Sequence, residues 1–437
     1  MNAYLQLAEQ LSLPRRWIVV AETPFLPANG GGEREHLGFV QAAAAAGLIA
    51  ALVVPVDADP AAVGREDDLP AIASLVDPAP MITVPRRRSL RHALNWRLPY
   101  VVASRPARPD LADEVRRAAP DADGIVVFTY KSHELGRVLA EALDLPAVVR
   151  FHNLEGVYHR AMAASSRPPR SWAVRLEAER IAADERRLER ASWVSGIADI
   201  SVVDAALRAR RAGVPVMHVP PFALGTRAAD AMSEWRPSSA PTVAFLGALD
   251  VATNHDAVSW FAREVWPLIL AAVPNCRWQV VGRRPTPAMR ELVAATAGAE
   301  LHPDVADPYV FLSAAGVAVN PAVSGSGVNI KLLEYLNAAV PVVSTRRGAA
   351  GIDLAAGVDL QVADSAQNFA RATVDLLKAP DQAARLGASG RRSALRILDA
   401  TSGLAQLGAL LGGAIGAGQP VGGAGAVVSV GSRRRPG

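Results

Sequence analysis

Short runs of β-branched residues alternate with helical patterns along this chain of 437 residues, and this alternation is the feature that most constrains its fold. In the first half the pattern predicts strands at residues 17–21, 48–54, 124–128, 147–151, 193–198 and 214–221. Helical patterns lie between them, at residues 33–46, 132–143 and 171–192. Strands that alternate with helices form parallel sheets with crossover helices, so this half predicts a doubly wound α/β domain.

The same alternation starts again after residues 223–240, a polar stretch with proline that has the composition of a linker. The chain is therefore expected to form two Rossmann-like domains of similar size, residues 1–222 and 241–402. Residues 403–437 are rich in glycine and alanine, which predicts a flexible tail. The strands expected in the second domain are residues 241–247, 277–282, 316–321 and 340–345.

The composition excludes several classes of protein. Half of the residues are hydrophobic and 20% are charged, which is too apolar for a disordered chain. The net charge of +4 includes the three arginines at 433–435, so the body is nearly neutral and no nucleic-acid partner is expected. A single cysteine excludes a disulfide framework, and the histidines lack metal-ligand spacing, so no metal site is expected.

Two observations bear on location. No secretory signal opens the sequence, and its longest apolar run, residues 42–56, is shorter than the about 20 residues that span a bilayer. We therefore expect a cytoplasmic protein. Residues 84–99 interleave five arginines with leucine and tryptophan. Such a segment either docks peripherally on the inner face of an anionic membrane, or forms a solvated helix or a substrate-site loop.

Three glycine-bearing segments follow predicted strands, at the edge of a parallel sheet where ligands bind. The first holds Gly30, Gly31 and Gly32, directly before a predicted helix. Glycines let the backbone approach a ligand closely and a helix N-terminus attracts an anion, although a tight turn is the alternative. In the second segment Gly247 ends a strand, and Asn254 is expected to cap the next helix, to contact a phosphate, or both.

The third segment, residues 320–345, is the most informative. A strand runs into Ser324–Gly327, and the helix that follows carries Lys331 and Glu334 one turn apart on the same face. A glycine-rich helix start with a nearby lysine suits a diphosphate, and Glu334 is placed to accept hydrogen bonds from sugar or ribose hydroxyls. The alternative is a simple surface Glu–Lys pair, but lysine is scarce here, with only three in the chain.

Two common nucleotide-binding motifs are absent. The segment around Lys331 lacks the GxxxxGK[ST] spacing of a P-loop, and no predicted strand is followed by GxGxxG. The sequence therefore disfavours a P-loop ATPase or GTPase and an NAD-dependent dehydrogenase.

The segment GSGVNIKLLEYLNAAVPVVSTRRGAAGI, residues 325–352, resembles the donor-site signature of the retaining GT-B glycosyltransferases of family 4 (glycosyltransferase group 1). The triple glycine, RFHNLE at 150–155 and FLGALDVATNHDAV at 245–258 match that family in order and spacing. The resemblance covers roughly residues 17–400. It implies two Rossmann-like domains that face each other across a cleft, the first binding the acceptor and the second the nucleotide sugar.

The resemblance also implies roles for single residues. Lys331 would bind the donor diphosphate and Glu334 the ribose hydroxyls, while His152 matches a family histidine near the reacting carbon of the sugar. These three are the catalytic-site candidates. The remaining donor-binding candidates, mostly backbone donors, are Gly30, Gly31, Gly32, Gly247, Asn254, Arg283, Gly325, Ser326 and Gly327.

Two departures from the family pattern concern donor binding. Ser326 stands where the first glutamate of the usual family pair would be, which leaves recognition of the sugar hydroxyls open. The arginine and lysine that commonly follow the first strand of the second domain are missing as well. The diphosphate charge would then rest on Lys331, main-chain donors and Arg283.

The activity implied by the resemblance is transfer of a sugar, of the hexosyltransferase type, from a nucleotide sugar with retention of anomeric configuration. The acceptor would be a saccharide, a lipid-linked molecule or a small molecule, as in polysaccharide biosynthesis. Neither a cofactor nor a divalent metal is implied, because the nucleotide sugar is a co-substrate. Two alternatives stay open: a GT-B sugar-nucleotide epimerase, and a catalytically inert sugar-nucleotide-binding protein.

Overall fold

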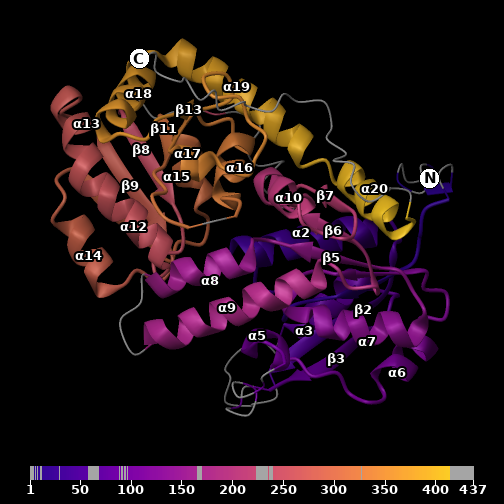
Figure 1. Cartoon of the computed structure of the whole chain (residues 1–437). Helices are drawn as coiled ribbons and strands as arrows, with labels where there is room; N and C mark the ends of the chain where they lie inside the picture. Colours follow the sequence, from indigo (N-terminus) through magenta and orange to yellow (C-terminus); the bar gives the residue numbers. More distant parts are fainter. Residues whose placement is uncertain are drawn as a thin grey trace, which may run out of the picture.

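The computed structural model describes residues 12–28, 30–57, 68–87, 97–164, 170–222, 240–325 and 327–413, with single residues 4, 6, 8, 9, 89, 92, 95 and 235 between them. It contains two parallel sheets with helices packed around them (Figure 1). The predicted fold class, two doubly wound α/β domains, is confirmed.

The first sheet has seven strands in the order β3-β2-β1-β4-β5-β6-β7. Its strands are β1 (Trp17–Val20), β2 (Ile49–Asp57), β3 (Met81–Arg86), β4 (Gly124–Val127), β5 (Ala147–Phe151), β6 (Val194–Asp199) and β7 (Val216–His218). The connecting helices are α2 (Gly31–Ala45), α3 (Leu69–Val76), α5 (Tyr100–Ala103), α6 (Leu111–Ala118), α7 (His133–Leu143), α8 (Glu155–Ala164), α9 (Arg170–Leu188) and α10 (Val202–Ala209). The winding direction reverses between β1 and β4, and ligands bind at such a switch point.

The second sheet has six strands in the order β10-β9-β8-β11-β12-β13, and its winding reverses between β8 and β11. Its strands are β8 (Thr242–Leu246), β9 (Arg277–Gly282), β10 (Ala299–Pro303), β11 (Val317–Asn320), β12 (Val342–Ser344) and β13 (Gln361–Val362). The helices are α12 (Ala252–Trp260), which continues through a π-helical turn (Phe261–Val265) into α13 (Trp266–Ala272), then α14 (Pro287–Ala294), α15 (Tyr309–Ala314), α16 (Ile330–Asn337), α17 (Arg346–Ala349), α18 (Ala366–Lys378), α19 (Pro380–Ile397) and α20 (Ala400–Leu411).

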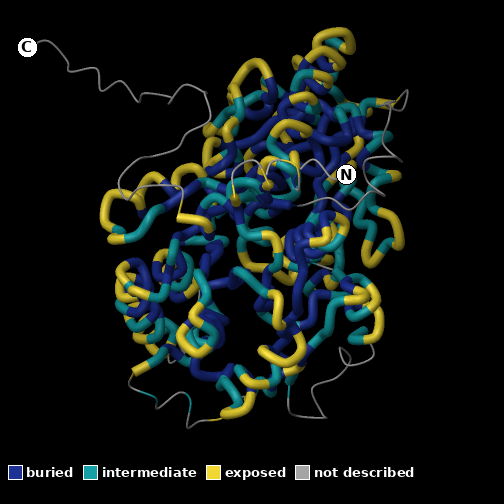
Figure 2. The backbone as a smooth tube through the Cα atoms, turned by 90° about the vertical axis from the view of Figure 1, so that its right-hand side faces the viewer, coloured by how far each residue is buried: buried dark blue, intermediate teal, exposed yellow. Residues whose placement is uncertain are grey.

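The cores lie on both faces of each sheet, and Figure 2 shows the buried residues gathered inside the molecule with exposed residues on its outer turns. Strands β1, β4 and β5 are buried along their whole length, as expected for central strands of a parallel sheet. The apolar runs of β1 and β4, and that of β5 before Arg150, explain why these strands could be predicted from the sequence. The edge strands β3 and β10 were not predicted from the sequence, because they are only partly buried and mix polar with apolar residues.

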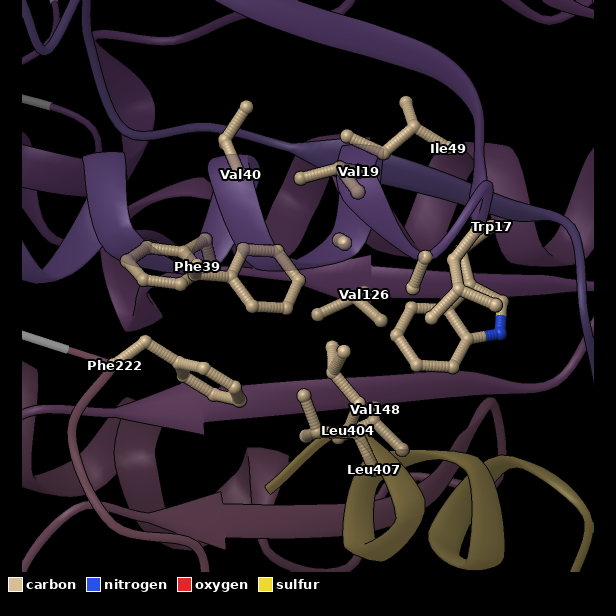
Figure 3. Close-up of a cluster of buried hydrophobic side chains, with 14 of the residues drawn as sticks. Trp17, Val19, Phe39, Val40, Ile49, Val126, Val148, Phe222, Leu404 and Leu407 are labelled. Carbon is tan, nitrogen blue, oxygen red and sulfur yellow. The ribbon is translucent and has the colours of Figure 1, made fainter. Parts of the chain in front are cut away.

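The prediction of a flexible tail from residue 403 is wrong for its first part. Helix α20 packs under the sheet of the first domain, where Leu404 and Leu407 lie beside Val148 and Phe222 (Figure 3). All four of its leucines (404, 407, 410 and 411) are at most 3% exposed. The glycines and alanines of this stretch therefore belong to a packed helix, and residues 414–437 of the predicted tail lie outside the described residues.

The chain passes between the two domains twice. The first passage is the predicted linker, residues 223–240, which lies outside the described residues except for Trp235 and Ala240. The second is the step from α19 of the second domain to α20 of the first, where the Asp399 carboxylate accepts from the Thr401 N–H and caps α20. The first domain is therefore completed by α20, which follows the second domain in the sequence.

Candidate functional site

A cleft of about 1310 Å³ lies between the two domains, at the carboxyl ends of their central strands. Most of the residues predicted from the sequence line it: Gly30, Gly31, Gly32, His152, Gly247, Asn254, Arg283, Lys331 and Glu334. Gly325 and Gly327 precede the lining residues Val328–Lys331 in sequence but do not line the cleft themselves, and Ser326 lies outside the described residues. The structure thus brings together residues that are up to three hundred positions apart in the sequence.

The N-termini of α2 and α16 meet across this cleft. A Cβ atom placed on Gly31 would lie 3.3 Å from the side chain of Ile330, the first residue of α16. That spacing is tighter than ordinary side-chain contacts, so glycine at this position favours the close approach of the domains, and a larger residue would press on Ile330. Each helix start presents backbone N–H groups and the positive end of its dipole, which favours an anion. The N–H of Gly30 is already taken, because it donates to the Glu33 carboxylate at 2.8 Å.

Lys331 lies beside the start of α12. Its ammonium donates to the Asn254 side-chain oxygen and lies 4.4 Å from the centre of the Phe245 ring. A Cβ on Gly247 would lie 3.0 Å from Nζ, so glycine leaves room for this side chain. Burial lowers the pKa of Lys331 to about 7, although the Glu334 carboxylate opposes the shift. An anion bound beside Nζ would restore its full charge.

The predicted cap at Asn254 is wrong. The cap residue of α12 is Val251, and Asn254 is the third residue of the helix. Its side-chain nitrogen donates instead to the Ala248 carbonyl at 2.8 Å, which holds the amide oxygen toward Lys331. Asn254 therefore positions the lysine rather than closing the helix end.

Gly325 and Gly327 have left-handed backbone conformations, with φ of +103° and +77°. A Cβ on Gly327 would lie 2.1 Å from the Asn153 side-chain oxygen and 2.9 Å from the His152 carbonyl oxygen. This loop of the second domain therefore packs against the end of β5 in the first. The proposed donation of their N–H groups to phosphate stays a prediction.

Glu334 is 4% exposed and pairs across the cleft with Arg34, from the first turn of α2. The Tyr309 hydroxyl donates to the same carboxylate, and burial together with Glu334 raises the pKa of Tyr309. Sequence reasoning missed Arg34 and Tyr309, because both pair with Glu334 from distant segments. To accept ribose hydroxyls, Glu334 must exchange or share these partners.

Arg283 lies at the end of β9 on the same side of the cleft as Lys331. Burial and the neighbouring cations Arg284 and Arg34 lower its pKa. Arg284 is offset by Asp250 at 2.9 Å. The excess of positive charge around Arg283 is the electrostatic environment that attracts an anionic ligand.

His152 is held by a buried carboxylate that the sequence did not reveal. Its Nε2 lies 2.8 Å from Oε2 of Glu35, and the Arg150 guanidinium binds the other oxygen at 2.7 Å. Burial alone would raise the pKa of Glu35, but Arg150 and His152 lower it to about 2. Glu35 therefore stays ionised and can only accept, so His152 Nε2 carries the proton. The available signal was Arg150, an arginine inside a buried strand, which needs an acidic partner.

A second charged group lines the first domain. Lys131, which follows β4, pairs with Glu22 at the end of β1 at 2.7 Å. Arg105, 2% exposed, donates through Nε to the Glu22 carbonyl at 3.0 Å. Sequence analysis did not select these residues, although Lys131 is one of only three lysines and follows a predicted strand.

The comparisons with known proteins agree with this geometry. Residues 240–379 match the family model described as glycosyl transferases group 1. The match covers about a third of the chain. The matched region holds Gly247, Lys331 and Glu334. Among curated proteins, none matches the sequence.

Solved structures of the GT-B type share the whole fold. The sucrose-phosphate synthase of Thermosynechococcus elongatus is 16% identical, with a TM-score of 0.61 over 91% of this chain and 98% of that one. A glycosyltransferase from Rickettsia africae is 10% identical, with a TM-score of 0.60 over 91% and 98%. Anabaena HepE, solved with UDP-glucose, is 12% identical, with a TM-score of 0.56 over 92% and 100%. Together they confirm the GT-B arrangement of the two domains.

None of the described helices is long and apolar enough to cross a membrane. No group of three or more histidine, cysteine, aspartate or glutamate side chains in the described part of the chain is placed to hold a metal ion.

Proposed function

We propose that this glycosyltransferase-fold protein transfers a hexosyl group from a nucleotide sugar to an acceptor hydroxyl, with retention of anomeric configuration as in family 4. The single observation that carries the proposal is the place of Lys331. Its ammonium lies in the cleft, next to the start of α12, on a helix whose N-terminus faces that of α2. A diphosphate placed there would meet one ammonium and the positive ends of helix dipoles.

The chemistry that this arrangement supports is loss of a diphosphate leaving group. The bond between the sugar carbon and the diphosphate oxygen breaks, and the acceptor oxygen bonds to the same carbon. The acceptor proton passes to the departing phosphate oxygen. The protein's main task is to stabilise the negative charge that develops on the diphosphate, which Lys331, Arg283 and the helix N-termini are placed to do.

His152 and Glu334 complete the proposed site. His152 lies at the end of β5 on the opposite wall from Lys331, oriented by Glu35, and is proposed to face the reacting sugar. Glu334 is proposed to bind ribose hydroxyls after exchanging its contact with Arg34. The nucleotide sugar serves as co-substrate and no metal is required, so activity should persist in excess chelator.

The first experiment is a thermal-shift screen with UDP, GDP, ADP and dTDP sugars, because a ligand that binds the folded state raises its apparent stability. Release of the nucleoside diphosphate is then measured with and without candidate acceptors, using Lys331→Ala as the variant and Lys378→Ala, an exposed lysine outside the cleft, as the matched control. Acceptor-dependent release that Lys331→Ala abolishes supports transfer. Conversion of the bound sugar without an acceptor would indicate an epimerase, and binding without turnover an inert binding protein.

The location and the membrane contact are part of the same proposal: a cytoplasmic enzyme that touches the inner face of the membrane through residues 84–99. Of this segment, Leu90, Leu94 and Trp96 lie outside the described residues, and Arg86 lines the cleft. Flotation with anionic vesicles, comparing the protein with its triple variant in which arginines 86–88 become glutamine, tests the contact. Equal partitioning of the two proteins would reject it.

A further inference from the structure

The wall of the cleft that belongs to the first domain is built from paired opposite charges. We call it the acceptor wall and define it by Glu22, Asp57, Arg86 and Lys131, with Thr129 and His36 behind them. Arg105 is buried beside Glu22 and does not line the cleft. From this wall we infer that the acceptor is a neutral, hydroxyl-rich saccharide, rather than a phosphorylated or lipid-anchored molecule. This inference rests on the proposed function and names the class of its second substrate.

The central pair is Glu22 with Lys131, 2.7 Å apart, and both side chains are about a third exposed to the cleft, at 27% and 30%. Burial alone would raise the pKa of Glu22, but Lys131 and Arg105 lower it to about 2. Burial alone would lower the pKa of Lys131, but the carboxylates of Glu22 and Glu155 outweigh burial and raise that pKa above its usual value. Both groups are therefore charged at neutral pH, the carboxylate as an acceptor and the ammonium as a donor of hydrogen bonds.

A second pair extends the wall along the sheet. Asp57 at the end of β2 lies 3.6 Å from Arg86 at the end of β3. Because neighbouring strands are about 4.8 Å apart, this pair lies on the order of 10 Å from the pair formed after β1 and β4. The wall therefore presents alternating acceptors and donors over a length that more than one sugar ring can span.

Two buried uncharged polar groups on the wall have no hydrogen-bond partner among the described residues. The Thr129 hydroxyl and the Nε2 atom of His36 lack a hydrogen bond, and both residues are 4% exposed and line the cleft. Burial lowers the pKa of His36 to about 3, so its ring is neutral. An unsatisfied buried polar group is costly, and a bound ligand with hydroxyl groups would satisfy both.

The charge pattern decides between classes of acceptor. A sugar hydroxyl both donates and accepts, so it can bridge a carboxylate and an ammonium that are already paired. A phosphate gains little attraction here, because the two described cations that line the wall each have a carboxylate beside them: Asp57 for Arg86, and Glu22 for Lys131. Across the cleft, by contrast, Lys331 donates to the neutral amide of Asn254. The ring of Tyr158, half-buried at the cleft, offers an apolar face for a sugar ring.

The test is saturation-transfer NMR on the full chain with a fixed panel. The panel holds neutral di- and trisaccharides of glucose, galactose, mannose and N-acetylglucosamine, and their uronic-acid and 6-phosphate counterparts. Binding to phosphatidylglycerol vesicles is measured in parallel. Thr129→Val is the decisive variant, because it replaces an unpartnered buried hydroxyl by a methyl of the same size and should leave the melting temperature unchanged or higher. Glu22→Gln is the second variant, and Glu300→Gln, which breaks an exposed ion pair outside the cleft, is the control.

We expect at least one neutral saccharide to bind more tightly than its charged counterparts, and Thr129→Val and Glu22→Gln to weaken that binding by about fivefold or more, the factor for one lost hydrogen bond. Glu300→Gln should bind as the parent protein does. Tighter binding of the acidic or phosphorylated sugars, binding to vesicles alone, no saccharide binding, or unchanged binding in both variants would each overturn the inference. Donor binding and its dependence on Lys331 are measured separately. If donor binding is intact while the saccharide results fail, only the inferred acceptor class is wrong and the proposed function stands.

Discussion

Binding of a sugar nucleotide should be accompanied by uptake of a proton at Lys331. Burial holds the pKa of this lysine at about 7 in the free protein, so only about half of the molecules carry the charge at pH 7. A diphosphate charge about 4 Å from the ammonium contributes about 4 kcal/mol at the effective dielectric constant of a protein surface. That energy corresponds to a rise in pKa of about three units, so the bound lysine stays protonated to about pH 10.

The number of protons taken up follows from these values. With a free pKa of about 7, binding should take up about 0.1 proton at pH 6, about 0.5 at pH 7 and about 0.9 at pH 8. Between pH 7 and the bound pKa, the affinity for the donor should fall about tenfold for each pH unit. The diphosphate of a sugar nucleotide is esterified at both ends and does not titrate in this range, so the proton must come to the protein.

Isothermal titration calorimetry with UDP-glucose, or with whichever sugar nucleotide the thermal screen selects, measures this uptake. Titrations at one pH in buffers of different ionisation enthalpy give the proton number from the slope of the observed heat. Lys331→Met should lose the uptake at pH 8, and Lys378→Met, which changes an exposed lysine outside the cleft, should keep it. Binding without proton uptake in the parent protein at pH 8, or equal uptake in Lys331→Met, would refute the reasoning.

Three further predictions concern packing and stability. Gly327→Ala should weaken donor binding and lower the melting temperature more than Gly357→Ala does. Both glycines have φ near +80°, but of the two only Gly327 contacts the other domain. Equal effects of the two substitutions in both assays would contradict this contact. Glu35 has a pKa of about 2 in the folded protein, and its ordinary value is 4.5. Its contribution to stability is therefore present above pH 4.5 and is lost as the pH falls toward 2. Urea titrations from pH 5 to 3 should show this loss of unfolding free energy, and the loss should be smaller in Glu35→Gln. Leu407→Ala should cost about 2–5 kcal/mol in chemical denaturation, because this side chain is fully buried against the first domain. A Leu407→Ala variant as stable as the parent protein would contradict the packing of α20.

The fold was predictable from the sequence because its central strands are buried on both faces. Strands such as β4 and β8 have no exposed residue, so they form continuous apolar runs that stand out between helices. Helix α20 has apolar residues at helical spacing as well, but its glycines lower the intrinsic helix propensity and suggested a tail. Burial against the first domain overrides that propensity, and no local pattern announces such a long-range contact.

The candidate site was predictable where one segment carried the pattern. Lys331 and Glu334 share a short motif that follows a strand, and the structure places both in the cleft. Glu35 and His152 meet across 117 positions of sequence, so their pairing is not visible in either segment alone. On helix α2, Glu35 has the appearance of an ordinary surface charge until the buried Arg150 is placed beside it.

The cations on the two walls of the cleft have different partners, and this difference separates the proposed binding sites of the diphosphate and of the acceptor. On the second domain, Lys331 donates to a neutral amide, so no carboxylate offsets the attraction of its ammonium for an anion in this contact. We therefore expect the diphosphate to be stabilised on this wall both before and after the sugar leaves. On the first domain, Lys131 and Glu22 already neutralise each other, so that wall can orient hydroxyl groups without competing for the diphosphate. In the proposed site the side-chain charges that stabilise the developing negative charge, Lys331 and Arg283, therefore come from the second domain, and the first domain adds only the N-terminus of α2. Opening of the cleft would then separate the nucleotide product from the glycosylated one.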